Sequence, residues 1–287
     1  MTKTETKSTV LLKHHLKSLK LPTMHNECEK IAQRCAADNA DHLAYLLQLC
    51  ELELIERERK AAERRLKAAR FPAAKLLDEF DFAARPSINK PLVLQLVQGD
   101  YLEKRENVLL VGPSGTGKSH LAIALGFEAV KAGKSVFFAT LAELVDSMRK
   151  AEREGKLRDR VKFLSRYSLL IVDEIGYLPV GSGGGNLFFQ LVNACYERCA
   201  MIMTGNRGFG EWADIFGDTV VATALLDRLL HHAVVISIEG NSYRLREHAA
   251  LIPEHLRART AREPEPLMPP KRRPGRPRKE YAAASPG

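Results

Sequence analysis

The hydrophobic pattern of the chain changes near residue 70. Before that point, apolar side chains recur at steps of three and four residues, which is the spacing of one face of an α-helix. The recurring positions are Leu43, Leu46, Leu47, Cys50 and Leu54. The pattern predicts a helix that continues through Glu51–Arg70, where charges of both signs replace the apolar stripe, and that Pro72 ends. We therefore expect residues 1–70 to form a small helical domain.

From Phe71 onward, short apolar runs alternate with helical patterns. We expect strands at Val108–Val111, Ser135–Ala139, Leu169–Asp173, Met201–Thr204 and Val234–Ile238. We expect helices at Lys118–Ala132, Leu141–Glu154, Asn186–Glu197, Glu211–Phe216 and Ala224–Leu230. Strands that alternate with helices indicate an α/β fold, in which a parallel sheet carries helices on both faces. We assign residues 71–250 to this domain, and residues 251–287, which are rich in proline, arginine and glutamate, to a disordered tail.

Residues 112–119 match the phosphate-binding loop pattern G-x-x-x-x-G-K-[ST]. A predicted strand precedes the loop and a predicted helix follows it, which is the context that the motif requires and that an incidental glycine-rich turn lacks. Lys118 can reach the β- and γ-phosphates of a nucleotide, and the Ser119 hydroxyl can bind Mg²⁺. The expected nucleotide contacts come from Gly112, Pro113, Ser114, Gly115, Thr116, Gly117, Lys118, Ser119 and His120.

The predicted strand that begins at Leu169 ends in two carboxylates, Asp173 and Glu174. Ligands of open parallel sheets bind at the carboxyl ends of the strands, so both acids are expected at the nucleotide site. Asp173 would hold Mg²⁺, and Glu174 would polarise the water that attacks the γ-phosphate. Alone, the pair also fits a strand that merely ends in surface acids. Downstream of a phosphate-binding loop it indicates ATP hydrolysis rather than kinase or GTPase chemistry.

Four further polar residues are candidates for the same chemistry. Asn206 follows the predicted strand at 201–204, and it either orients the attacking water or lies in an ordinary turn. Arg228 is either an arginine finger that projects into a neighbouring subunit's ATP or a solvated helix residue. Arg244 and Arg246 follow the last predicted strand, and each is a candidate to contact the γ-phosphate in its own subunit.

Composition limits the class of protein. The formal net charge is +9, which favours a polyanionic partner. No apolar run approaches the roughly 18 residues of a membrane helix, and the polar, basic start of the chain has no apolar signal region. The five cysteines show no C-x-x-C spacing. We therefore expect a cytoplasmic protein with reduced thiols and no membrane partner.

Positive charge gathers at both flanks of the nucleotide-binding part. Residues 56–70 contain seven basic and three acidic side chains, and the basic ones can lie along DNA phosphates. The candidate contacts there are Arg57, Arg64, Arg65 and Lys67. A solvated helix with ion pairs, such as Glu56 with Lys60, explains this pattern equally well.

The second basic flank lies at residues 271–279, which contain six basic side chains and no acidic ones around a Gly-Arg-Pro core. This stretch resembles an AT-hook, whose flat Arg-Pro ribbon suits the minor groove of A·T-rich DNA. The candidate DNA contacts are Arg273, Arg276 and Arg278. A solubilising basic tail and a nuclear localisation signal are the alternatives.

The order of these motifs resembles the AAA+ ATPases of the DnaA/DnaC-like branch, and within them the IstB-like helper ATPases of bacterial insertion sequences. The resemblance covers roughly residues 43–247. The stretches that carry it are Glu53–Phe82, Gly112–Leu125, Leu170–Pro179 and Thr204–Arg246. Within the last stretch, Gly-Glu-Trp at 210–212 and Leu-Leu-Asp-Arg-Leu at 225–229 are especially specific.

The resemblance implies a role for each candidate. Lys118 and Ser119 become the Walker A residues, Asp173 and Glu174 the Walker B pair, Asn206 sensor 1, Arg228 the trans-acting finger and Arg244 sensor 2. It further implies a bacterial ATPase that forms homo-oligomers with ATP at the subunit interfaces. Such proteins assemble on double-stranded DNA, and they recruit and stimulate a cognate transposase.

Two other functions stay open. A helicase loader similar to DnaC would take a hexameric helicase as its partner. A DNA-binding scaffold that needs ATP only to hold its oligomer together is disfavoured by Glu174, because a scaffold needs no water-activating carboxylate. The chain departs from such relatives at Gly205, where serine is common, and at Cys195, where arginine is common. Neither change removes a catalytic group, and the glycine-rich loop at 181–185 has no functional assignment.

Overall fold

The computed structural model describes residues 7–181 and 183–240. All of them belong to the first of two units of the chain, Met1–Arg244. Several predicted features lie outside the described residues: the tail at 251–287, the candidate phosphate contacts Arg244 and Arg246, and the candidate DNA contacts Arg273, Arg276 and Arg278.

Three helices form the N-terminal part: α1 (Lys7–Ser18), α2 (Pro22–Ala37) and α3 (His42–Ala69). The Asp41 side chain caps α3 by accepting a hydrogen bond from the Ala44 amide. The helix ends where Arg70 takes a left-handed conformation with φ of 61°, two residues before Pro72. The predicted helical region is therefore present, and its long helix ends where the sequence indicates.

The face of α3 that packs against α2 differs from the predicted apolar stripe. Leu49 and Glu53 are buried there, in contact with the α2 side of a small core that contains Cys28 and Ile31. The stripe positions Leu43, Leu46, Leu47 and Leu54 are exposed, whereas Cys50 is half-buried and packs against that core. Helical spacing identifies apolar faces of a helix, but it does not say which face meets a neighbouring helix within the same chain.

Five parallel strands form the sheet, which lies in the order β2-β3-β4-β1-β5. The strands are β1 (Asn107–Val111), β2 (Val136–Thr140), β3 (Leu169–Ile175), β4 (Ala200–Gly205) and β5 (Ala233–Ser237). All five predicted strands are confirmed, with bounds shifted by one or two residues at their ends. β1 lies between β4 and β5, so the loop that follows β1 opens near the middle of the sheet.

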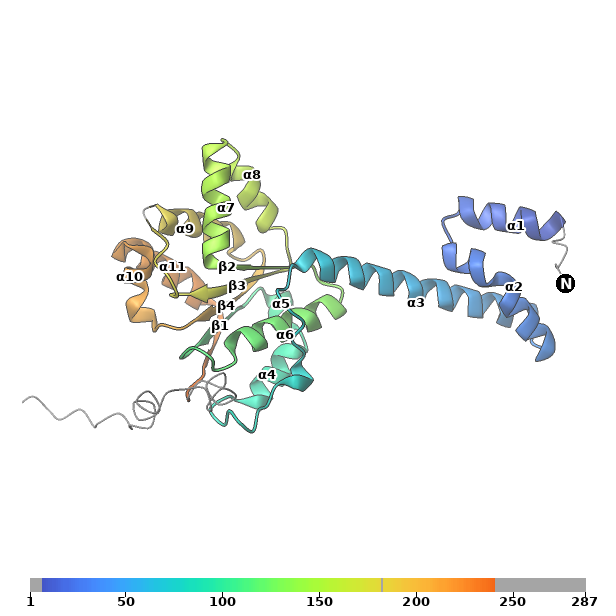
Figure 1. Cartoon of the computed structure of the whole chain (residues 1–287), viewed down its shortest axis with the longest axis horizontal. Helices are drawn as coiled ribbons and strands as arrows, with labels where there is room; N and C mark the ends of the chain where they lie inside the picture. Colours follow the sequence, from blue (N-terminus) through green and yellow to red (C-terminus); the bar gives the residue numbers. More distant parts are fainter. Residues whose placement is uncertain (1–6, 182, 241–287) are drawn as a thin grey trace, which may run out of the picture. The chain divides into compact units, whose positions relative to one another are not determined.

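Helices cover both faces of the sheet, as predicted (Figure 1). One face carries α4 (Lys90–Val97), α5 (Asp100–Lys104) and α6 (Lys118–Lys131). The other carries α7 (Leu141–Arg153), α8 (Leu157–Leu164), α9 (Gly184–Cys195), α10 (Trp212–Phe216) and α11 (Thr219–His231). The sequence did not predict α4, α5 or α8, which are among the shorter helices of the fold.

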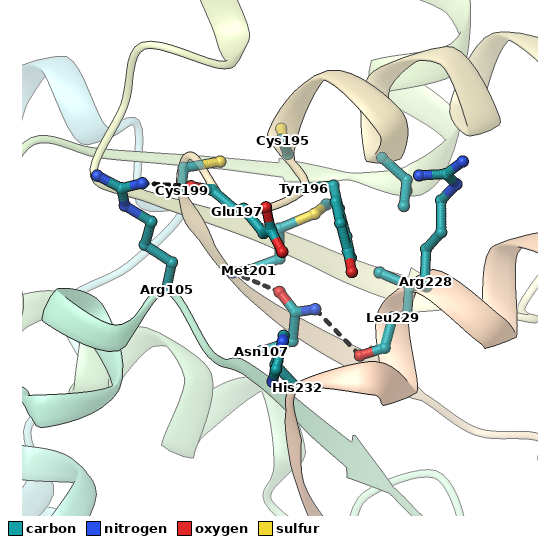
Figure 2. Close-up of a pocket in the computed structure, with 11 residues that line it drawn as sticks. Arg105, Asn107, Cys195, Tyr196, Glu197, Cys199, Met201, Arg228, Leu229 and His232 are labelled. Atoms are coloured by element: carbon teal, nitrogen blue, oxygen red, sulfur yellow. Dashed lines mark hydrogen bonds between the residues drawn. The ribbon is translucent and has the colours of Figure 1, made fainter.

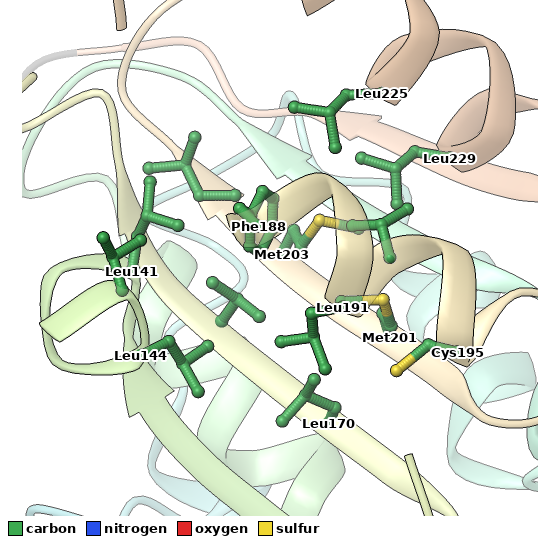
Figure 3. Close-up of a cluster of buried hydrophobic side chains, with 14 of the residues drawn as sticks. Leu141, Leu144, Leu170, Phe188, Leu191, Cys195, Met201, Met203, Leu225 and Leu229 are labelled. Atoms are coloured by element: carbon green, nitrogen blue, oxygen red, sulfur yellow. The ribbon is translucent and has the colours of Figure 1, made fainter. Parts of the chain in front are cut away.

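Alternate strand residues supply the two cores. Leu109, Leu170 and Met201 belong to the core beneath α7, α9 and α11, and Figure 3 shows Leu170 and Met201 there. Val108 and Ile171 belong to the core on the α6 side. The end of α3 joins the second core, because Ala69 is fully buried in it and Phe71 stacks on Phe127 of α6 with ring centroids 4.8 Å apart. Within the described residues, every helix is too short or too polar to cross a membrane.

Candidate active site

The loop between β1 and α6 is held by positions that only glycine fits. Gly112 has φ of +154°, and a Cβ on it would lie 2.1 Å from the Ile238 carbonyl oxygen. Gly117 has φ of +100°, and a Cβ there would lie 2.7 Å from the Phe80 ring. L-residues rarely adopt these angles, and a side chain would also collide with the Ile238 carbonyl oxygen or the Phe80 ring. The two glycines therefore fix how closely the loop is packed between β5 and the segment before β1.

Lys118 is buried at the start of α6, with its ammonium group turned into the loop. Its Nζ donates hydrogen bonds to the carbonyl oxygens of Gly112 (2.7 Å) and Pro113 (2.6 Å). The first N–H groups of a helix have no partner within the helix, and together with the helix dipole they attract anions. A buried ammonium group beside a helix N-terminus is the arrangement that binds nucleotide phosphates.

Three residues from three elements meet at one carboxylate oxygen. Ser119 Oγ, on α6, donates a hydrogen bond to Asp173 Oδ1 over 2.8 Å, and Thr204 Oγ1, on β4, donates to the same Oδ1. Asp173 and Thr204 are both buried. Hydroxyl and carboxylate oxygens are the ligands that Mg²⁺ prefers, so Ser119 and Asp173 would be able to hold Mg²⁺ beside the phosphate-binding loop. The sequence did not reveal Thr204, because a threonine in an apolar strand carries no motif signal.

Glu174 leaves the regular path of β3. Its φ is +63°, and the pairing of β3 with β4 shifts register between Val172 and Ile175. The Glu174 amide donates to Thr204 Oγ1 over 3.1 Å, which anchors the distortion to β4. A bulge of this kind re-aims a side chain, and left-handed residues other than glycine persist where the surroundings hold them. The Glu174 side chain is exposed, and it lines a groove together with Thr140 and Tyr177.

Asn206 lies directly after β4, beside the distorted part of β3. The backbone amide of Asn206 donates a hydrogen bond to the Ile175 carbonyl oxygen over 3.3 Å. Its buried Oδ1 has no hydrogen-bond partner among the described residues. A Cβ on Gly176 would lie only 2.8 Å from that oxygen. A buried polar atom without a partner is costly, so it marks a position where a water or a ligand group is expected.

A segment before β1, residues 76–85, also covers the loop, and none of its residues was predicted to lie at the nucleotide site. His120 contacts the Leu76 carbonyl oxygen through Nε2 at 2.8 Å, and its ring packs edge-on against Phe80 with centroids 5.3 Å apart. Arg85 is buried, and its Nη2 donates to the Gly115 carbonyl oxygen at 3.4 Å. The loop is thus enclosed by residues that are far from it in the sequence.

Arg228 lies near the amino ends of the strands, whereas Lys118, Asp173 and Glu174 lie at their carboxyl ends. Asn107, the first residue of β1, donates from Nδ2 to the carbonyl oxygen of Leu229 (3.0 Å) and from its amide to that of His232 (2.8 Å). Figure 2 shows Arg228 beside Leu229 and Tyr196 in this region. Strands rise about 3.3 Å per residue, so the length of β1 separates its amino end from the phosphate-binding loop by about 13 Å. The predicted finger residue and the loop therefore do not meet within one chain.

The candidate DNA contacts on α3 differ in their surroundings. Arg57 donates to Glu53 Oε1 (2.8 Å) and to the Lys20 carbonyl oxygen (2.6 Å), so it holds α3 to the chain before α2. Arg64 and Lys67 are exposed and Arg65 is half-buried. The ion pair of Glu56 with Lys60, at 3.4 Å, is present, as the solvated-helix alternative predicts. Glu56 also pairs with Arg59, whose hydrogen bond lowers the pKa of Glu56 to about 2.

The sheet order, the loop between β1 and α6, and the paired oxygens of Ser119 and Asp173 are together typical of a nucleotide-binding P-loop protein. A family description supports this and narrows it. Residues 14–250 match the family of IstB-like ATP binding proteins. The chain belongs to this family of insertion-sequence ATP-binding proteins.

Named relatives agree with this assignment. The chain is 42% identical over 232 residues to the ATP-binding protein of insertion sequence IS21 from Pseudomonas aeruginosa, covering 81% of this chain and 88% of the relative. It is 38% identical over 229 residues to the ATP-binding protein of insertion sequence IS5376 from Geobacillus stearothermophilus, covering 80% and 91%.

Solved structures with a similar fold include replication proteins. AMPPCP-bound DnaA from Aquifex aeolicus is 22% identical with a TM-score of 0.47, and the match covers 67% of this chain and 57% of that one. The DnaC helicase loader is 18% identical with a TM-score of 0.45, covering 52% and 87%.

Proposed function

We propose that the protein is an ATP-hydrolysing AAA+ regulator that assembles on DNA and that recruits and stimulates a transposase. The observation that carries the enzymatic part is the position of Glu174. The bulge in β3 turns this carboxylate out of the sheet directly after Asp173, while Asp173 itself is buried against Ser119. This arrangement supports a cation-binding role for Asp173 and a water-activating role for Glu174.

The chain's own residues divide the work of hydrolysis. Lys118 leaves the carbonyl oxygens of Gly112 and Pro113 and binds the β- and γ-phosphates. Ser119 and Asp173 hold Mg²⁺, which neutralises phosphate charge when bound. Glu174 accepts the proton of the attacking water, and Asn206 orients that water through its otherwise unpartnered Oδ1. Arg244 is assigned to the γ-phosphate by the family resemblance alone.

The position of Arg228 supports an oligomer with ATP at its subunit interfaces. Because Arg228 lies near the amino ends of the strands, it cannot reach phosphates bound at the carboxyl ends of the strands in the same chain. In a head-to-tail assembly the same residue would reach the ATP of the next subunit. An arginine supplied from a neighbour stabilises charge that develops on the transferred phosphoryl group, and it makes turnover depend on assembly.

The insertion-sequence relatives and the positive charge support the DNA-directed part of the proposal. The net charge is +9, and Arg64, Arg65 and Lys67 make no ion pair with the described residues. Such side chains contact phosphates without reading sequence. We place the protein in the bacterial cytoplasm, where double-stranded DNA and a cognate transposase are its partners. A helicase loader would respond to single-stranded DNA or a helicase instead of double-stranded DNA, and an ATP-dependent scaffold would need no ATP turnover.

The test is ATP turnover by the purified chain and by Glu174→Gln, with Glu152→Gln at an exposed position of α7 as the matched control. We expect Glu174→Gln to keep ATP binding and to lose turnover by roughly a hundredfold or more, because general-base catalysis contributes on that order. Glu152→Gln should behave as wild type. Unchanged turnover in Glu174→Gln would refute the assigned base, and absence of turnover in the wild-type chain would leave the scaffold function.

A further inference from the structure

Two aromatic rings flank the side chain of Arg228. Its guanidinium carbon lies 5.7 Å from the ring centroid of Phe189 and 5.4 Å from that of Tyr196. Both distances fall within the range of cation–π attraction. Phe189 lies on α9 and Tyr196 directly follows that helix, whereas Arg228 lies on α11. All three side chains are half-buried. Figure 2 shows Tyr196 and Arg228 facing each other.

A second contact fixes Tyr196 to the same helix as Arg228. The Tyr196 hydroxyl lies 2.8 Å from His231 Nδ1, and His231 is one turn beyond Arg228 on α11. The Tyr196 backbone is also held, because its amide donates to the Val192 carbonyl oxygen over 2.9 Å. The ring therefore cannot rotate away from Arg228 without breaking the bond to His231.

We infer that Phe189 and Tyr196 are positioning residues for Arg228, and that His231 holds Tyr196 in place. The inference rests on the proposed function, in which Arg228 acts on the ATP of a neighbouring subunit. An arginine side chain has many rotamers, and ordering it at the moment of assembly lowers the benefit of its contact. Rings that hold the side chain in one orientation beforehand reduce that loss. The aromatic pair would thus raise turnover of the assembled protein without touching the nucleotide.

The first experiment measures kcat, KM and ATP affinity of the assembled protein. The variants are Tyr196→Leu and Phe189→Leu, which remove a ring, and Tyr196→Phe, which removes only the bond to His231. The matched control is Phe163→Leu on α8, because Arg160 and Arg166 lie over the Phe163 ring in a similar way.

We expect each ring deletion to lower kcat by roughly five- to tenfold, with ATP affinity unchanged and a smaller loss in Tyr196→Phe. Phe163→Leu should stay within roughly twofold of wild type. In the Arg228→Ala background, Tyr196→Leu should cause no further loss, because the ring acts only through Arg228. A general folding defect would instead add to the loss and weaken ATP binding.

The second experiment mixes Tyr196→Leu subunits with Glu174→Gln subunits, which retain ATP binding and an intact Arg228. A Glu174→Gln neighbour supplies the finger to the competent site of the Tyr196→Leu subunit, so turnover should recover above that of either variant alone. Wild-type kcat in Tyr196→Leu while Arg228→Ala is inactive would overturn the positioning role and leave the shared site intact. Full turnover in Arg228→Ala would overturn the shared site itself, and the positioning role with it.

Discussion

Ser119 and Asp173 are joined by a 2.8 Å hydrogen bond from Oγ to Oδ1, although β4 lies between the strands that lead to them. The bond connects α6, which begins in the phosphate-binding loop, to the end of β3. A shift of either element changes the distance between two oxygen ligands of the proposed magnesium site. Nucleotide binding and the position of Glu174, the next residue of β3, are therefore linked through one contact.

Asp173→Asn should separate ATP binding from its dependence on magnesium. The asparagine keeps an oxygen that accepts the hydrogen bonds of Ser119 and Thr204, but it lacks the charge that holds a divalent cation. We expect ATP affinity without Mg²⁺ to match wild type, and the gain on adding Mg²⁺ to fall by about tenfold or more. Titration of a fluorescent ATP analogue with and without Mg²⁺ measures both quantities. A full magnesium response in the variant would show that Asp173 is not a ligand.

Thr204→Val should lower turnover more than ATP binding. The methyl group that replaces the hydroxyl cannot donate to Asp173 or accept from the Glu174 amide, so both acids lose a partner. We expect kcat to fall by about 10- to 100-fold, as for other residues that orient a metal ligand through a hydrogen bond. Thr204→Ser restores the hydroxyl and should recover most of kcat. Similar rates for the valine and serine variants would leave Thr204 with a packing role only.

Gly112→Ala should destabilise the part of the chain that contains the sheet. A Cβ there would lie 2.1 Å from the Ile238 carbonyl oxygen, and backbone cannot yield as a flexible side chain can. We expect a loss of about 1–3 kcal/mol in the free energy of unfolding, as for other overpacked sites. The matched control is Gly208→Ala, where a Cβ meets nothing within 4 Å, and it should stay within about 0.5 kcal/mol. Fluorescence of Trp212, the single tryptophan, follows unfolding of this part.

Much of this core can be predicted from the sequence because its signals are local. The five strands are continuous apolar runs, and the loop at Gly112 has a motif that depends on backbone conformation alone. Thr204 and Arg85 could not be found in the same way, because their importance comes from contacts with residues distant in the sequence. The face of α3 that packs against α2 could not be predicted for a related reason. The spacing of leucines identifies an apolar face of a helix but not the face that a second helix contacts. In the structure, α2 packs against Leu49 and Glu53.

Glu53 should make the N-terminal helices sensitive to acid. Its carboxylate accepts hydrogen bonds from the amides of Thr23 (2.8 Å) and Met24 (3.1 Å) at the start of α2, and from Arg57. Burial raises the pKa of Glu53, but the amide of Met24, the Arg57 side chain and the amide of Thr23 outweigh it, so the pKa is lowered. A lowered pKa in the folded state gives stability that is complete above the unfolded pKa of about 4.3 and is lost as pH falls through the folded value.

Glu53→Gln removes this titration, so its N-terminal helices should lose less stability between neutral and acid pH than those of wild type. Glu58→Gln, at an exposed position of α3, is the matched control and should keep the wild-type pH dependence. Circular dichroism follows the helices during denaturation at each pH, while Trp212 fluorescence follows the part that contains the sheet separately. Equal acid sensitivity in wild type and Glu53→Gln would contradict the capping role of Glu53.

The most direct test of the account is ATP turnover and sedimentation of the wild-type chain with and without double-stranded DNA. The account predicts that DNA raises the rate and that ATP drives large complexes on it, since Arg228 completes a site only in a neighbouring subunit. Stimulation by single-stranded DNA or a helicase, with no response to double-stranded DNA, would replace the transposition regulator with a helicase loader. A rate that is independent of both DNA and assembly would contradict the shared ATP site.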